Sequence, residues 1–271
     1  MRPTSKPESP ALKARTFQCM GTVIGLTVPM AGNDDGGSQA ATEEALGSAA
    51  DAVECIFREL DGQFSLYRPD SEASRVARRE VTPKETSAGF RDRYAEAANW
   101  RLLTEGSFTP ERPDGAPDLS GLVKGYAVQE AGAALASLGL TDWCLNAGGD
   151  VLVSGSPIVG TTATWQAGIV DPQDRGILLA AYPLGGSTTA RALATSGSAE
   201  RGDHIWTRST GPSEFLQVSV AAADIVTADV LATAIVAGGL PMLNRATDGW
   251  DIQVLAVRRD GGLLATPGFR A

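Results

Sequence analysis

The sequence predicts an α+β fold in which mainly antiparallel sheets carry packed helices. Segments with helical spacing of apolar residues lie mostly in the first half of the chain. Short β-like runs, separated by turn residues, follow in the second half. Helices and strands do not alternate regularly along the chain, and this order favours antiparallel pairing over a parallel βαβ arrangement.

The first half is expected to contain one strand followed by helices. Residues 17–29, FQCMGTVIGLTVP, contain many β-branched residues and predict a strand. The recurrence of apolar residues every three or four positions predicts an amphipathic helix over 41–60. Further helices are expected at the end of the loop 60–76, over 90–105 and within 118–139.

The second half is expected to be a set of short strands interrupted by one strong helix. The β-like runs cover residues 143–155, 164–184, 191–197, 203–209, 214–223 and 251–266. The junctions DPQD and RDGG within two of these runs suit hairpins. The helix is expected to begin at Thr227 as its N-cap and to stop at Gly238 and Gly239, just before Pro241.

Composition excludes several classes of partner. The chain has 271 residues, is 43% hydrophobic and carries a formal net charge of -9, so it can bury a sizeable core and has no basic field for a phosphate backbone. Nucleic acid and anionic membranes are therefore not expected as partners. No segment approaches the length of a membrane span.

The N-terminus and the cysteines indicate where the protein is expected to be found. The first 13 residues lack the apolar run of a signal peptide. Cys19, Cys55 and Cys144 are far apart and show no C-x-x-C spacing, which favours reduced, buried thiols. We expect a cytoplasmic protein, or an exported one if a leader has been removed.

An acid and a hydroxyl stand four residues apart in the apolar segment TADVLATAIVAGG. Asp229 and Thr233 would lie on the same face of the predicted helix, one turn apart. Spacing alone favours a structural role, because such pairs are common in ordinary helices and an acid stabilises a helix N-terminus. The two oxygens are equally suitable ligands for a hard cation such as Mg²⁺.

The sequence contains two glycine-rich segments, and a lysine lies in the first. Lys124, one of only four lysines, is flanked by Gly121 and Gly125 at a predicted helix start, where free N–H groups favour an anion. The segment lacks the pattern of a P-loop, which excludes an ordinary nucleoside triphosphatase. A second glycine pair occurs in NAGGD, residues 146–150. Close packing explains either loop alone, but together they suggest a ligand that carries phosphate and binds with a metal.

Seven motifs occur in an order that resembles the ApbE family of flavin transferases. They are MGT, FSLYRPDSEASRV, DLSGLVKGYAV, LNAGGDVLVSG, ATSGSAERG, HI before TG, and ADVLATA, spread over about residues 15–257. Enzymes of this family transfer FMN from FAD to a threonine of a target protein. The resemblance implies an ApbE-like, T-fold-related architecture with residues 1–14 as a disordered tail and 15–271 as one flavin transferase domain.

The resemblance also assigns roles at the centre of the site. It implies that Asp229 and Thr233 are side-chain ligands of a catalytic Mg²⁺, completed by the backbone carbonyl of Val123. Such an ion would bridge the pyrophosphate of FAD and orient the phosphorus for in-line attack. AMP would be the leaving group, and a threonine hydroxyl of the acceptor would be the nucleophile. His204, the only histidine, matches a family histidine that could relay the proton of the acceptor.

Other positions are similar to family residues around the flavin. Core filling is the alternative for Met20 and Tyr67, which match residues placed against the flavin ring. An ordinary turn is the alternative for Thr195 and Ser196, which match a stretch that lines the flavin or phosphate. The residues that match the FAD-contacting loops of the family are Asp118, Lys124, Gly148, Gly149 and Asp150.

Two departures from the family pattern leave an alternative function open. Thr109 in GSFTP and Thr207 in HIWTRSTG each occupy a position where the family usually has an acid. The alternative is therefore an FAD-binding protein, or an FAD pyrophosphatase that yields FMN and AMP without protein transfer. The expected partners are FAD and an acceptor with the pattern Asp-Gly-x-Thr-(Ser/Gly)-Ala-Thr, which this chain does not contain.

Overall fold

One large antiparallel sheet runs through the protein. The computed structural model describes residues 12–30, 36–197 and 213–269, and its main sheet has the order β1-β2-β3-β4-β7-β8-β9-β10, with every neighbouring pair antiparallel. A second, two-stranded sheet pairs β5 with β6. The strands are β1 Leu12–Cys19, β2 Thr22–Pro29, β3 Trp143–Ala147, β4 Asp150–Ser154, β5 Trp165–Val170, β6 Leu178–Leu184, β7 Ala192–Gly197, β8 Phe215–Ala222, β9 Gln253–Arg258 and β10 Leu263–Ala265.

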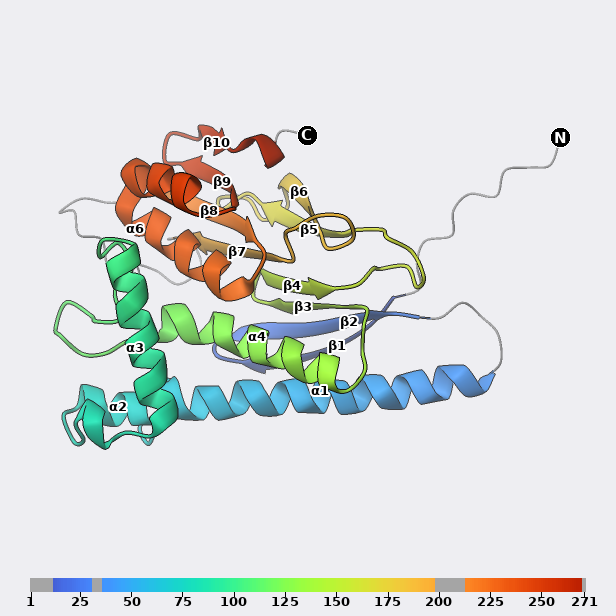
Figure 1. Cartoon of the computed structure of the whole chain (residues 1–271), viewed down its shortest axis with the longest axis horizontal. Helices are drawn as coiled ribbons and strands as arrows, with labels where there is room; N and C mark the ends of the chain where they lie inside the picture. The colour runs from blue at the N-terminus through green and yellow to red at the C-terminus, as the bar shows by residue number, and fades with distance from the viewer. Residues whose placement is uncertain (1–11, 31–35, 198–212, 270–271) are drawn as a thin grey trace.

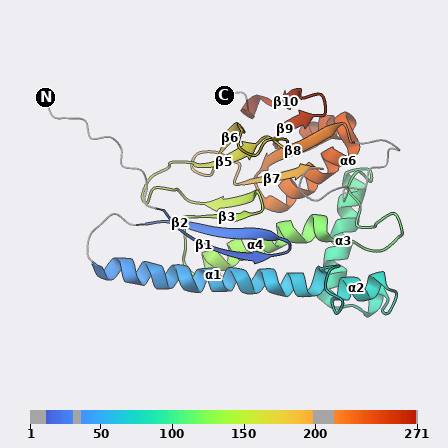
Figure 2. The same cartoon turned by 180° about the vertical axis from the view of Figure 1, so that it is seen from behind.

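Three of the helices, α1, α4 and α6, pack against this sheet. The α-helices are α1 Gly36–Phe64, α2 Glu72–Ala77, α3 Ala88–Leu103, α4 Ser120–Ser137 and α6 Ile225–Gly249, with 3-10 turns η1 Pro83–Glu85 and η2 Pro267–Phe269. In Figure 1, α4 and α6 cross in front of the strands, and from behind, in Figure 2, the strands lie in front of these helices. The observed architecture confirms the predicted α+β fold with mainly antiparallel sheets.

Alternate residues of the central strands belong to two different cores. On β7, Ala192 and Ala194 join the core beneath the helices, whereas Leu193 packs into a smaller core with β5 and β6. On β4, Leu152 faces the helices and Val151 the small sheet. Because successive side chains of a strand point to opposite faces, the middle of the sheet is buried on both sides and its register is strongly specified.

The predicted strand 17–29 is wrong as a single element, because it is a hairpin that turns at Met20 and Gly21. Cys19 pairs with Thr22 across this two-residue turn. Both turn residues have positive φ, 49° at Met20 and 71° at Gly21, as a type I′ turn requires. Methionine is rare at such a position, so the sequence carried only half of the usual signal. The first strand begins at Leu12, inside the predicted tail of residues 1–14.

The remaining first-half helices occur where apolar spacing predicted them, with ends set by capping groups. Helix α1 extends further in both directions than the predicted 41–60. Ser71 and Ser87 cap α2 and α3, because each side-chain oxygen accepts an N–H three residues on, from Ser74 and Phe90. The two predicted hairpins of the second half are also present, as β5–β6 and β9–β10, and the predicted run 143–155 folds into a third hairpin, β3–β4. The run 203–209 lies outside the described residues.

Helix α6 differs from its prediction at its start. Its N-cap is Asp224, whose carboxylate accepts the N–H of Thr227 at 2.8 Å, so Thr227 is wrong as the cap. The predicted stop coincides with a break: Gly239 is non-helical, with φ 65° and ψ -154°, and a second helical segment continues to Gly249. The carboxylate of Glu214 then accepts the N–H of Leu240 at 3.1 Å and caps the second half.

The prediction that no segment approaches the length of a membrane span is wrong for this helix, which is long and apolar enough to cross a membrane by length and composition. In the described part of the chain it is the one such helix, and 61% of its apolar window is buried within the protein. It packs against β7, β8 and α4, as the core helix of a folded domain does.

Candidate functional site

The predicted acid and hydroxyl lie together on α6 at the junction of helix and sheet. Asp229 is only 2% exposed, and Thr233 follows one turn later on the same face. The hydroxyl of Thr233 lies 3.0 Å from that of Ser196 on β7. Ser196 was predicted to line the flavin or phosphate, and Thr233 was predicted to bind the metal. The structure brings these two residues into contact.

A glycine allows α4 to approach α6 beside Asp229. A Cβ atom on Gly125 would lie 3.3 Å from Cα of Val226 and 3.5 Å from Oδ2 of Asp229. These distances are at or below ordinary van der Waals contact, so the glycine lets the two helices meet closely. Val123, whose carbonyl is the third predicted ligand, lies two residues earlier on α4 and is 3% exposed.

Lys124 connects two buried carboxylates. Its ammonium forms an ion pair with Oδ2 of Asp150 and lies 3.9 Å from Oδ1 of Asp229. The side chains of Asp150 and Asp229 are 0% and 3% exposed, and that of Lys124 is 13% exposed. Charges this deeply buried must be compensated by neighbours, so the three residues form one electrostatic unit, called here the Lys124 cluster.

Asp150 also joins this cluster to β7. Its Oδ1 accepts the backbone N–H of Thr195 at 3.0 Å, just beyond the last paired residues of β4 and β7, Val151 and Leu193. The side chain therefore satisfies a backbone donor where the strand ladder stops. The hydroxyl of Thr195 instead bonds Ser219 at 2.8 Å, so only its N–H faces the cluster, and the neighbouring Ser196 faces α6.

The predicted glycine pair forms the turn of the β3–β4 hairpin, directly before Asp150. Gly148 and Gly149 have φ of 63° and 97°, so both need the left-handed region. A Cβ on Gly148 would overlap the side chain of Thr22, whereas one on Gly149 would meet nothing within 4 Å. The N–H of Gly148 donates to Val23 at 3.1 Å. The motifs MGT and NAGGD, separated by more than a hundred residues, thus lie side by side.

Met20 and Tyr67, the predicted flavin neighbours, differ in burial. Met20 is half-buried and packs against the main core. Tyr67 is 88% exposed, so core filling is the wrong alternative for this residue. Contact with a flavin stays a prediction for both residues.

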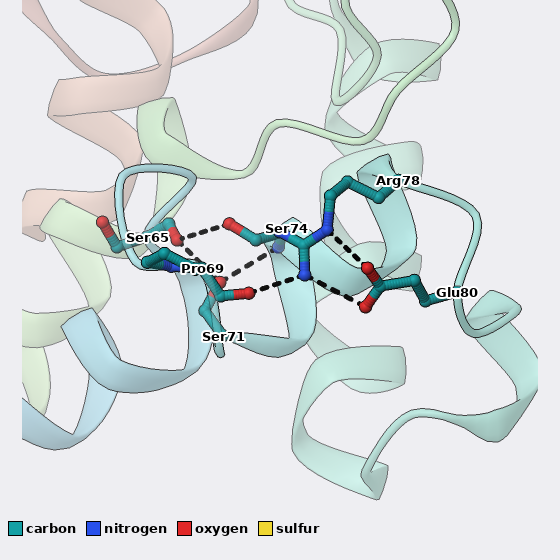
Figure 3. Close-up of polar contacts among 6 residues, drawn as sticks. All are labelled: Ser65, Pro69, Ser71, Ser74, Arg78 and Glu80. Carbon is teal, nitrogen blue, oxygen red and sulfur yellow. Dashed lines mark hydrogen bonds and ion pairs between the residues drawn. The ribbon is translucent and has the colours of Figure 1, made fainter.

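The loop that carries Tyr67 is braced by hydrogen bonds (Figure 3). The carbonyl of Ser65 accepts the hydroxyls of Ser71 and Ser74 at 2.7 and 3.3 Å. Arg78 donates to the carbonyl of Pro69 at 2.7 Å and pairs with Glu80. The exposed aromatic ring therefore projects from a loop whose backbone is held in place.

Near the start of α4, Thr109, where the resemblance predicts an acid, has a carboxylate beside it. The hydroxyl of Thr109 donates to Glu111 at 2.9 Å. Tyr94 donates to the other oxygen of Glu111 at 2.8 Å, and burial together with this bond raises the pKa of Tyr94 to about 12. Asp118 accepts the N–H of Ser120 at 3.0 Å and so braces the first turn of α4. The sequence analysis did not single out Glu111. Its position two residues after Thr109 was the only signal that could have found it.

His204 and Thr207 lie outside the described residues, so their predicted roles stay predictions. Ser219 was also missed, because nothing in the sequence links it to Thr195. Within the described ranges, no three His, Cys, Asp or Glu side chains gather as a metal cluster. A metal here would depend on mixed oxygen donors, which are the set predicted: one carboxylate, one hydroxyl and one carbonyl.

These donors fit a hard divalent cation. Asp229 supplies the negative charge, at the point of α6 that Gly125 allows α4 to approach, and Thr233 supplies an oxygen one turn away. A magnesium ion usually keeps several waters and takes only a few protein oxygens. The residues present are therefore compatible with Mg²⁺ bound beside the phosphates of a ligand.

Comparison with known proteins gives the same family from sequence and from structure. The ApbE family model matches residues 111–252, just over half of the chain. An FAD:protein FMN transferase of Haemophilus influenzae is 24% identical, over 60% of this chain and 61% of its own length. One of Rhodobacter capsulatus is 32% identical, over 57% of this chain and 30% of its own. The chain thus spans less than two thirds of either relative.

Solved structures confirm the fold over nearly the whole chain. The ApbE protein of Thermotoga maritima has a TM-score of 0.76 at 20% identity and covers 96% of this chain and 98% of its own. The flavin transferase ApbE of Vibrio cholerae has a TM-score of 0.71 at 21% identity and covers 97% and 99%. With the family match over residues 111–252, which contains the Lys124 cluster and the pair on α6, this chain belongs to the ApbE family.

Proposed function

We propose that this protein is a Mg²⁺-dependent FAD:protein FMN transferase that moves FMN from FAD to a threonine hydroxyl of an acceptor protein and releases AMP. The observation that carries the proposal is the Lys124 cluster, which contains Asp229, together with Thr233 one turn further along α6, where α4 and α6 meet closely. Family membership and two relatives that are FAD:protein FMN transferases support the choice of substrate.

The chemistry is the exchange of one phosphorus–oxygen bond for another. The acceptor hydroxyl oxygen bonds to the phosphorus of the FMN half, and the bond between this phosphorus and the bridging oxygen breaks. AMP leaves with the bridging oxygen, and the hydroxyl proton passes to a base, a role that the resemblance gives to His204. Protein catalysis of such a transfer depends mainly on positioning and charge stabilisation.

The described residues supply both of these contributions. Asp229, Thr233 and the Val123 carbonyl would hold Mg²⁺, which when bound neutralises charge on the pyrophosphate oxygens. Lys124 brings a positive charge to the same place, on a side chain fixed by Asp150. The β3–β4 turn leaves open space at the side-chain position of Gly149, so a ligand can approach its backbone closely there.

Release of AMP from FAD tests the proposal. We expect AMP only when Mg²⁺ and an acceptor domain with a target threonine are both present, and a flavin-labelled acceptor in equal amount. EDTA and Asp229→Ala should each abolish both products. Asp248→Ala is the matched control, because Asp248 is an exposed acid on the same helix.

The other outcomes of this assay choose between the alternatives. AMP and free FMN without any acceptor would identify an FAD pyrophosphatase instead. Bound FAD that stays intact would identify a flavin-binding protein that has lost catalysis. AMP that is insensitive to both EDTA and Asp229→Ala would refute a metal site at this position.

A further inference from the structure

Lys124 has a place at the metal site that its expected contact with FAD does not require. Its ammonium lies 3.9 Å from Oδ1 of Asp229, the only carboxylate among the three predicted metal ligands. Before any metal binds, the negative charge of this buried acid is thus compensated by a cation of the protein itself. A divalent ion that binds Asp229 enters the field of this ammonium.

Asp150 is a second carboxylate partner of the Lys124 ammonium. One oxygen of Asp150 is held by the Thr195 N–H at 3.0 Å, and the other pairs with the ammonium. The carboxylate is fully buried and anchored to β7, so it is a fixed second partner for Lys124. The Lys124 ammonium is therefore shared between the anchored carboxylate of Asp150 and the carboxylate of Asp229, the predicted metal ligand.

We propose that Lys124 is an internal counter-ion of Asp229 which a divalent cation must outcompete, and that Asp150 weakens this competition by holding the ammonium away from Asp229. Lys124 and Asp150 are then positioning residues that set the affinity for the metal. The inference rests on the proposed function, since it takes Asp229 as a metal ligand. It gives this chain a charged lysine that can turn to ligand phosphates once the metal has neutralised Asp229.

The two residues should have opposite effects on metal affinity. Lys124→Met removes the competing charge and keeps the length of the side chain, so the metal should bind more tightly, by about tenfold or more for a charge this close. Asp150→Asn keeps an oxygen for the Thr195 N–H but releases the ammonium to Asp229, so the metal should bind more weakly by a similar factor. Lys84→Met, at an exposed lysine on η1, should change nothing.

A double variant separates competition from a general effect of charge. Lys124→Met with Asp150→Asn leaves the net charge of the cluster as it is in the natural protein, because one positive and one negative charge are removed together. Internal competition predicts that the double variant still binds the metal more tightly than the natural protein. An effect of net charge alone predicts equal affinity. The double variant also leaves no unpaired charge at these two positions, so it tests the proposal if Lys124→Met does not fold.

The experiment is a titration of the full chain with Mn²⁺ in the absence of FAD. Electron paramagnetic resonance measures the free ion at each step and so gives the affinity for the metal. Melting temperatures with and without Mn²⁺ give a second readout, and Lys124→Met should show the larger increase on addition of metal. Equal affinities of the natural protein and the double variant would overturn the proposal. If the natural protein and all variants fail to bind Mn²⁺, the metal site itself is wrong and the proposed function loses its support. Binding by the natural protein that Asp229→Ala abolishes, with no response to Lys124, would overturn only this inference.

Discussion

Replacement of Gly148 by alanine is expected to destabilise the protein by a contact that its neighbour Gly149 does not have. Both glycines have positive φ in the same turn, so alanine at either position meets backbone strain of roughly 1–2 kcal/mol. At Gly148 the added Cβ would also overlap Oγ1 of Thr22 and lie 3.0 Å from its Cβ. Overpacking of this kind costs about 1–3 kcal/mol.

The expected loss in the free energy of unfolding is therefore about 2–5 kcal/mol for Gly148→Ala and about 1–2 kcal/mol for Gly149→Ala. For a chain of this size each kcal/mol lowers the melting temperature by roughly 2–4 °C. Urea unfolding monitored by circular dichroism gives the free energy of unfolding of both variants. Thr22→Ala removes the overlapping hydroxyl and methyl groups, so it should restore part of the stability of Gly148→Ala and none of that of Gly149→Ala.

Equal losses for the two glycine variants would refute the packing of Thr22 against this turn. So would a Gly148→Ala protein that Thr22→Ala does not rescue, because the penalty would then come from the backbone alone. The same contact joins the motifs MGT and NAGGD, so we expect Gly148→Ala to weaken FAD binding in proportion to the fraction of molecules with a displaced turn.

Three further predictions concern single side chains. Asp224→Ala should lower the free energy of unfolding by about 1 kcal/mol, because the Thr227 N–H loses its cap; Asp248→Ala, measured alongside in urea, should cost much less. Ser196→Ala should weaken Mn²⁺ binding by a few-fold with little loss of stability, because Thr233 loses the hydroxyl that orients it; unchanged affinity would contradict that role. Burial opposes ionisation of Glu72, but hydrogen bonds from Ser87 and Gln63 outweigh this effect and lower its pKa below 4.5. Its contribution is thus complete above pH 4.5 and lost as the pH falls through the lowered pKa, so Glu72→Gln should be less stable than the natural protein at pH 7 and nearly equal to it in strong acid.

Local patterns predicted most of the elements, and the misses have physical causes. Apolar periodicity predicted the helices because each buries an apolar face, with α1, α4 and α6 packed against the sheet. The start of α6 was placed at Thr227 because both Thr227 and Asp224 are good capping residues, and only the fold decides which carboxylate or hydroxyl meets a free N–H. The turn at Met20 was missed because its conformation depends on the pairing of two whole strands, which overrides the preference of methionine.

The candidate site was predictable as a set of residues but not as a network. Motif order identified Lys124, Asp150, Ser196 and Thr233, and the structure brings these into one group with Asp229. No local signal shows that Asp150 accepts a backbone N–H from β7, because the contact joins positions 45 residues apart. Tertiary hydrogen bonds of this kind depend on strand register, which a single sequence does not display.

The two-sided burial of β7 has a consequence for how this protein tolerates insertions and deletions. Leu193 and Ala194 belong to different cores, and the next two residues divide in the same way, with Thr195 bonded to Ser219 and Ser196 to Thr233. One residue added or removed just before Leu193 would exchange the faces of everything beyond it in β7. Such a change would turn Ser196 away from Thr233, and the same shift would turn Leu193 toward the helices. A chain with the wrong spacing in this strand should therefore fail to fold before it could appear as a folded but inactive protein.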